Sequence, residues 1–84
     1  MLEIGSFSRN GLFQITDTRK DNVSGELYVT VREMVGDHCL DMKRGAMIKA
    51  MRELAKKAAD NPTSTRLVYS WYGQNSDHAT FAIV

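Results

Sequence analysis

The sequence predicts an α+β fold: a mostly antiparallel sheet of about five strands with one amphipathic helix packed on one face, in the order β-β-β-α-β-β. Three observations support this. Residues 43–60 carry apolar side chains at three- and four-residue spacing, as one face of a helix requires. The segments before and after alternate apolar and polar residues with a period of two, and Gly, Asn, Asp and Ser separate them, which is typical of strands and turns.

Length and composition define the class of molecule. The 84 residues leave room for a single domain, 1–84, with one core, and the 43% hydrophobic and 25% charged residues are typical of a folded globular domain. Cys39 is the only cysteine, and no basic start followed by an apolar run opens the chain. We therefore expect a reducing, cytoplasmic location. No apolar stretch approaches the about 18 residues of a membrane span, so we expect no membrane partner.

Residues 2–18 predict a hairpin. Its loop is Asn10-Gly11, because both residues tolerate the positive φ of a type I′ turn. With these two residues in the loop, Ser8 faces Phe13 across the hairpin. The same register gathers four apolar residues on the face that we expect toward the core: Leu2, Ile4, Phe13 and Ile15.

A polar loop over 19–25 precedes a third strand, 26–35, which we expect to be central. Its alternation sends one set of side chains inward and the other outward. The inward set is Leu27, Val29 and Val31, and the outward set is Tyr28, Thr30 and Arg32. Gly36-Asp37 predicts a turn, after which 38–42 is either a fourth short strand or the lead-in to the helix.

The helix is predicted over 43–60, with Asp41 as its N-cap and Asn61-Pro62 as its end. Its apolar stripe consists of Met47, Ala50, Met51, Leu54 and Ala58. The opposite side carries Lys49, Arg52 and Lys56, which we expect to face water or a partner.

Two strands follow the helix. Residues 66–72 alternate Leu67, Tyr69 and Trp71 with Val68, Ser70 and Tyr72, so the pattern allows either face to point inward. Residues 73–77 predict a polar turn, and the last strand, 78–84, alternates Ala79, Phe81 and Ile83 with His78, Thr80 and Ala82. These two strands predict a closing hairpin.

The charge of the chain is unevenly distributed. Residues 43–60 hold six basic and two acidic residues, a net +4, which leaves −3 elsewhere because the whole chain carries +1. A basic helix on a mildly acidic body can orient toward an anionic surface. The alternative is an ordinary solvated face, because Glu53 lies four residues from both Lys49 and Lys57 and partly neutralises them.

The motifs of catalysis and metal binding are missing from the sequence. His38 and Cys39 are neighbours, but adjacent residues of a strand point to opposite faces. Asp77-His78 has no Gly-x-Ser-x-Gly nucleophile to serve, and no Cys-x-x-Cys or His-x-x-x-His spacing brings metal ligands together. We therefore expect no enzyme, no catalytic residue, no metal and no cofactor.

We expect instead a module that acts by contact with another protein or with a second copy of itself. The candidate partner-binding residues are basic residues of the helix and aromatic or basic residues of the strands. They are Lys49, Arg52, Lys56, Lys57, Tyr28, Arg32, Trp71 and Tyr72. The alternative is nucleic-acid binding, with the helix face 49–57 on phosphates and Tyr28 or Tyr72 stacking on bases, although a pI of 7.9 is low for that class.

Overall fold

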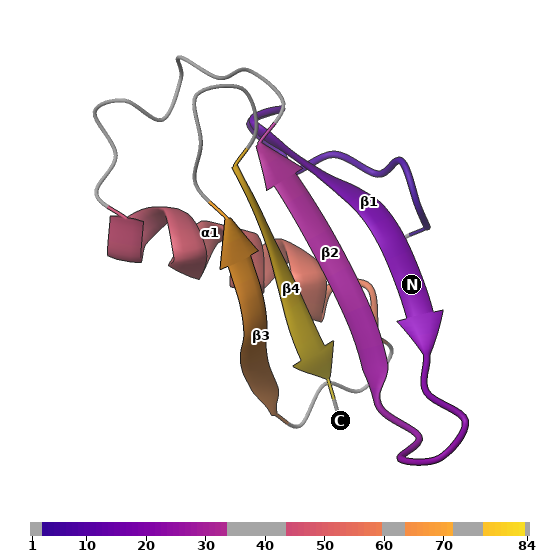
Figure 1. The fold of residues 1–84 in the computed structure, drawn as a ribbon. Coiled ribbons are helices and arrows are strands. Elements are labelled where there is room, and N and C mark those ends of the chain that lie inside the picture. The colour runs from indigo at the N-terminus through magenta and orange to yellow at the C-terminus, as the bar shows by residue number, and fades with distance from the viewer. Residues whose placement is uncertain (1–2, 34–43, 60–63, 72–76, 84) are drawn as a thin grey trace.

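The computed structural model describes residues 3–33, 44–59, 64–71 and 77–83. They form β1 (Phe13–Lys20), β2 (Leu27–Glu33), α1 (Arg44–Lys56), β3 (Thr65–Trp71) and β4 (His78–Ile83). The strands make one antiparallel sheet in the order β1-β2-β4-β3, and α1 lies across one of its faces (Figure 1). The α+β class is confirmed.

The expected number and order of strands differ from the structure. The described residues form four strands in the order β-β-α-β-β, where we expected about five in the order β-β-β-α-β-β. The missing strand is the first one, before Asn10. The short strand considered over 38–42 lies outside the described residues.

The loop at Asn10 and Gly11 has the predicted register but a different geometry. Phe7 pairs with Gln14, as a two-residue loop there requires. Gly11 has a φ of 76°, but Asn10 has no positive φ, so the expected type I′ turn is wrong. Instead, the Gly11 N–H donates to the Ser8 carbonyl at 2.9 Å, and the Asn10 Oδ1 accepts the backbone N–H of Leu12 at 3.1 Å.

The chain turns near Gly5 instead of continuing as the first predicted strand. Gly5 has a φ of 97°, and the Ser6 N–H donates to the Glu3 carbonyl at 3.1 Å, which closes a turn. Ile4 is therefore 57% exposed, and its expected place in the core is wrong. Leu2, predicted on the same face, lies outside the described residues.

β2 has the predicted central position between β1 and β4. Val29 and Val31 are fully buried and Leu27 partly, while Tyr28 and Thr30 are half-buried and Arg32 is exposed on the other face. The predicted alternation is confirmed. It follows from the two-residue period of a strand with a helix on one side.

The core lies between α1 and the sheet and draws on three strands. From the sheet it contains Phe13 and Ile15 of β1, Val29 and Val31 of β2, and Ala79, Phe81 and Ile83 of β4. The predicted stripe of α1 supplies Met47, Met51, Leu54 and Ala58, with Ala50 packed at its edge. No residue of β3 belongs to this core.

The helix itself spans Arg44–Lys56 and ends in a tighter turn. The N–H groups of Lys57, Ala58 and Ala59 donate to carbonyls three residues earlier, at 3.0–3.3 Å, as in a 3₁₀ turn. This turn carries Ala58 into the core, where it is 1% exposed. The predicted N-cap Asp41 and the predicted stop at Asn61-Pro62 lie outside the described residues.

Substitution of Gly25 and of Gly45 by alanine tests the backbone conformation at each position, because neither substitution causes a steric clash. Gly25 has a φ of 75°, Gly45 lies in the first turn of α1, and a Cβ at either would meet no heavy atom within 4 Å. Gly25→Ala should destabilise the fold by about 1 kcal/mol because a side chain disfavours positive φ. Gly45→Ala should stabilise it by about 0.5 kcal/mol, since Ala is the better helix former. Urea denaturation followed by circular dichroism measures both; equal signs would contradict the backbone geometry described here.

Candidate functional site

The most unusual surface of this molecule is β3, an edge strand that the helix leaves uncovered. α1 packs on β1, β2 and β4, and β3 pairs only with β4 among the described strands. Four large apolar side chains of β3 are exposed by 37–52%: Leu67, Val68, Tyr69 and Trp71. An exposed apolar edge strand offers both side chains and unpaired backbone groups to another chain.

The other edge of the sheet is partly covered by the chain itself. The Gly5 N–H donates to the Ile15 carbonyl at 2.7 Å, and the Ile15 N–H donates to the Ser6 carbonyl at 2.9 Å. The Ser8 N–H donates to the Phe13 carbonyl at 2.8 Å. The first part of β1 therefore has a neighbour on its outer side, whereas β3 has none among the described residues.

Register assigns the side chains of β3 to the two faces of the sheet, because residues directly opposite each other share a face. Leu67 pairs with Phe81 and Ser70 pairs with Ala79, both buried beneath the helix. Leu67 and Ser70 therefore lie on the helix side of the sheet, as does Thr65 opposite buried Ile83.

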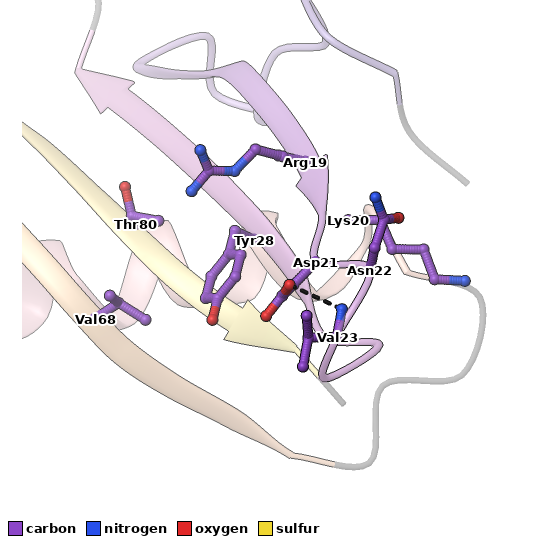
Figure 2. Close-up of a pocket in the computed structure, with 8 residues that line it drawn as sticks. All are labelled: Arg19, Lys20, Asp21, Asn22, Val23, Tyr28, Val68 and Thr80. Carbon is purple, nitrogen blue, oxygen red and sulfur yellow. Dashed lines mark hydrogen bonds between the residues drawn. The ribbon is translucent and has the colours of Figure 1, made fainter.

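The remaining residues of β3 lie on the opposite side, the open face, which no described helix covers. Tyr69 pairs with Thr80 and Trp71 with His78. Val68 is the extra residue where the register shifts between Leu67 and Tyr69, and it lines a concavity with Thr80 (Figure 2). A bulge of this kind breaks the alternation of faces. It places two successive apolar residues, Val68 and Tyr69, on the open face.

The open face continues from β3 across the whole sheet. The Tyr69 and His78 rings lie 5.7 Å apart, and the Thr30 and Thr80 hydroxyls are 2.8 Å apart. The Arg19 guanidinium lies 5.8 Å from the centre of the Tyr28 ring, within the range of a cation–π contact. The face is thus a mixed aromatic and polar surface with its largest exposed apolar side chains at the β3 edge.

Described residues line two concavities on the open face. The larger, about 670 Å³, lies between the loop after β1 and the side chains of Tyr28, Val68 and Thr80 (Figure 2). The smaller, about 330 Å³, is lined by Thr16, Thr30, Arg32 and His78. Both are open depressions on a surface rather than closed cavities.

The loop beside the larger concavity is stabilised by Asp21. The Ser24 hydroxyl donates to its carboxylate at 2.7 Å and the Val23 N–H donates at 3.1 Å. These two bonds, the serine bond foremost, hold the pKa of Asp21 below its ordinary value. The negative charge of Asp21 therefore stabilises the loop in which Asp21 itself lies.

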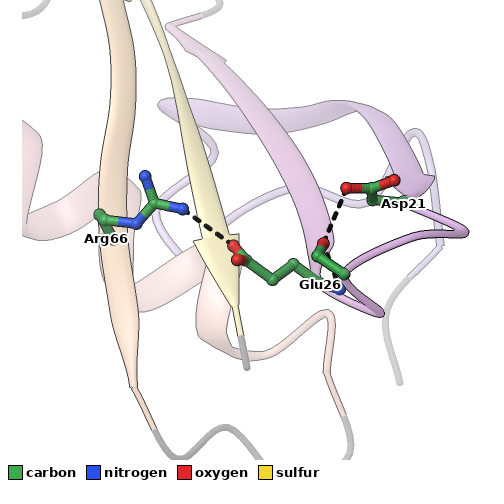
Figure 3. A network of polar contacts seen from close by, with 4 residues as sticks. Asp21, Glu26 and Arg66 are labelled. Carbon is green, nitrogen blue, oxygen red and sulfur yellow. Dashed lines mark hydrogen bonds and ion pairs between the residues drawn. The ribbon is translucent and has the colours of Figure 1, made fainter.

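Glu26 connects this loop to β3. Its carboxylate lies 3.0 Å from the Arg66 guanidinium, so the ion pair reaches from the start of β2 across β4 (Figure 3). Ala82, which pairs with Arg66 on the same face, is only 1% exposed. An ion pair this exposed contributes less than about 1 kcal/mol, so its main effect is to orient Arg66.

The predicted basic residues of the helix are not equivalent. Lys49 and Lys57 are exposed, and the Lys56 ammonium lies 3.9 Å from the Glu53 carboxylate. Arg52 is only partly exposed, whereas we expected its side chain to face water. Its guanidinium lies 5.7 Å from the Phe81 ring centre, and its buried Nε has no hydrogen-bond partner within the described residues.

The predicted partner-binding residues therefore fall on two separate surfaces. Tyr28, Arg32 and Trp71 belong to the open face, while Lys49, Arg52 and Lys56 of α1 and Lys57 just after it lie on the other side of the sheet. Tyr72 lies outside the described residues. Leu67 and Val68 are exposed at the β3 edge but were not among the predicted residues. The available signal was their run of consecutive apolar side chains, which puts apolar groups on both faces of a strand.

Comparison with known proteins identifies no relative. No protein-family model, no curated protein and no solved structure matches this chain. In the part of the chain that the structure describes, no three or more His, Cys, Asp or Glu residues gather as a metal site. None of the described helices has the length and apolar character needed to cross a membrane.

Proposed function

We propose that this chain is a small non-enzymatic binding module that acts by protein–protein contact through the edge strand β3. One observation carries the proposal: β3 exposes apolar side chains on both faces at the uncovered edge of the sheet. Natural sheets protect such edges with charges, prolines or covering segments. β3 has one charged residue, Arg66, and no proline. An edge strand with so few protective residues is suited to pairing with a strand of another protein.

The open face extends the proposed contact surface. Tyr69 and Trp71, each 52% exposed, continue inward to the half-buried Tyr28. Aromatic residues and Arg dominate the energy of many protein interfaces because they bury large areas with few rotatable bonds. Arg32 and Arg66 supply charges on the same face. We place the module in the cytoplasm as part of this proposal, since its one cysteine has no internal partner.

Nucleic-acid binding through the helix is the alternative, and the geometry favours it less. Of the four basic residues at 49–57, Arg52 packs toward Phe81 and Lys56 lies near Glu53. Two exposed lysines, Lys49 and Lys57, remain as candidates for phosphate contacts. So few cations give weak, strongly salt-dependent binding.

Site-specific photo-crosslinking tests the proposed contact. Benzoylphenylalanine would replace Tyr69, which is 52% exposed on β3, or Phe7, which is 53% exposed near the opposite edge. In the native cells, the label at position 69 should form protein adducts that the label at position 7 does not. Equal adduct yields at the two positions, or none at position 69, would reject β3 as the contact surface.

A further inference from the structure

We propose that the larger concavity of the open face receives a carboxylate side chain from an extended segment of the partner protein, and that Arg19 is the residue that binds this carboxylate. The inference rests on the proposed contact function and specifies the chemistry of the partner. It follows from the course of the concavity across the sheet, from the position of the Arg19 guanidinium and from the contacts of the acidic residues around it.

The concavity begins at the proposed contact edge and crosses the sheet (Figure 2). Every strand contributes to its lining, through Val68 of β3, Thr80 of β4, Tyr28 of β2 and Arg19 of β1. Neighbouring strands lie about 4.8 Å apart, so β3 and β1 are separated by about 14 Å. An extended peptide rises about 3.3 Å per residue. A partner segment that contacts Val68 therefore reaches Arg19 about four residues along its own chain.

Arg19 is held in a position that suits an oxyanion. It pairs with Tyr28 in the register of β1 and β2, and its guanidinium lies over the half-buried Tyr28 ring, 5.8 Å from the ring centre. A guanidinium over a ring uses its flat face for that contact, so the N–H groups at its rim stay available for a bidentate carboxylate. The ring also restricts the long side chain before binding, which lowers the entropy cost of binding.

None of the described acidic residues forms an ion pair with Arg19. The Glu26 carboxylate pairs with the Arg66 guanidinium at 3.0 Å. The Asp21 carboxylate accepts its two hydrogen bonds from its own loop. Asp17, two residues from Arg19 on the same face, is exposed and does not pair with it. The Arg19 guanidinium is thus a cation whose carboxylate partner can come from another protein.

The charge of the concavity suits a single carboxylate better than a phosphate. Lys20, the other basic residue of the lining, extends away from Tyr28, so one guanidinium lies over the floor (Figure 2). Sites that recognise phosphorylated segments gather several arginines. Asp21, which also lines the concavity, would repel the second negative charge of a phosphate. One guanidinium and one carboxylate match in both charge and geometry.

The remaining lining suits an apolar residue near the acidic one. Val23 is 95% exposed in the loop after β1, and Val68 is 46% exposed on β3. Both line the concavity together with the Tyr28 ring. An apolar side chain of the partner can cover Val68 while an acidic side chain reaches Arg19. We therefore expect a partner segment with an apolar and an acidic residue about four positions apart.

Selection from a displayed library of random nine-residue peptides tests this chemistry. The parent chain should enrich peptides with an acidic residue about four positions from an apolar one, and Arg19→Gln should lose the selection for the acidic residue. Arg9→Gln is the matched control, since Arg9 is an exposed arginine in the loop before β1, whereas Arg19 lies near the other end of that strand. It should select the same peptides as the parent. All three proteins should have the same circular dichroism.

Fluorescence anisotropy with one enriched peptide tests the contact itself. Replacing its acidic residue by glutamine should weaken binding to the parent about tenfold or more, because a charge-assisted pair is lost. Arg19→Gln should bind the two peptides equally, and Arg19→Lys should discriminate between them less than the parent, since lysine lacks the planar fork. An equal loss in the parent and in Arg19→Gln would overturn the role of Arg19. Tighter binding of a phosphoserine version of the peptide would overturn the choice of a carboxylate.

The failure of this inference differs from the failure of the contact function. Enriched peptides without an acidic residue, or no enrichment at all, overturn the carboxylate site. If the label at position 69 still captures proteins in that case, the contact function stands and its partner has a different chemistry. Selection of acidic peptides through Arg19 without any adduct at position 69 would keep the carboxylate site and reject β3 as the contact edge.

Discussion

Phe81→Ala is expected to lower the free energy of unfolding by about 3–5 kcal/mol, the typical cost of emptying a buried aromatic site. Phe81 is fully buried in β4, opposite Val29 of β2, and the Arg52 guanidinium lies 5.7 Å from its ring centre. Its removal would leave a cavity beneath the helix. A small domain has few kcal/mol to spare, so the variant should be largely unfolded at room temperature.

Urea denaturation followed by circular dichroism measures this loss, with Phe7→Ala as the control. Phe7 is 53% exposed and lies outside the core, so its truncation should cost well under about 1 kcal/mol. Similar losses in the two variants would contradict the assignment of Phe81 to the centre of the core.

Met51→Ala is expected to cost about 3 kcal/mol, within the usual range for a buried methionine. Met51 is fully buried against the sheet, at the middle of the helix stripe. Alanine has the higher helix propensity, so any loss must come from packing and not from the helix itself.

Lys49→Ala is the matched control for the helix, because it makes a substitution to alanine on the exposed side. Its effect should stay within about 0.5 kcal/mol of the parent. Equal effects of the two substitutions, measured by the same urea titration, would show that α1 packs through a different face from the one described.

The helix and the strands beneath it could be predicted because their periodicity has one physical cause. Each has a face against the core and a face toward water, so Met51 and Leu54 in α1, and Val29 and Val31 in β2, recur at the spacing of their element. The predicted alternation of β4 is of the same kind, and the structure places Phe81 on its buried face. An element that is buried on one side has apolar residues at a regular spacing, and this spacing can be recognised in the sequence.

The first strand was predicted wrongly because alternation alone does not report backbone geometry. Ile4 lies at a position that suits an inward strand residue, but Gly5 takes a φ of 97° and the chain turns. The Gln14 side-chain amide then donates to the Gly5 carbonyl at 2.9 Å. Such a long-range bond cannot be read from the order of the residues.

The candidate site was only partly predictable. The alternation of β3 allowed either face to be buried, and the structure leaves both of them exposed. That outcome depends on strand order, since α1 packs mainly on β1, β2 and β4 while β3 is the edge strand next to β4. Arg52 shows the converse: its helical position predicts exposure, yet Phe81 lies close enough to pack against its guanidinium.

Amide hydrogen exchange, measured residue by residue for the chain alone and for the chain bound to a partner identified through the label at position 69, tests the central claim that β3 is the contact edge. Contact through β3 predicts slower exchange at residues 65–71 in the complex, because outward amides of an edge strand gain partners. Residues of β1 and the exposed side of α1 should exchange at the same rates throughout. Slowing confined to α1, or exchange in β3 that is the same with and without the partner, would contradict the claim.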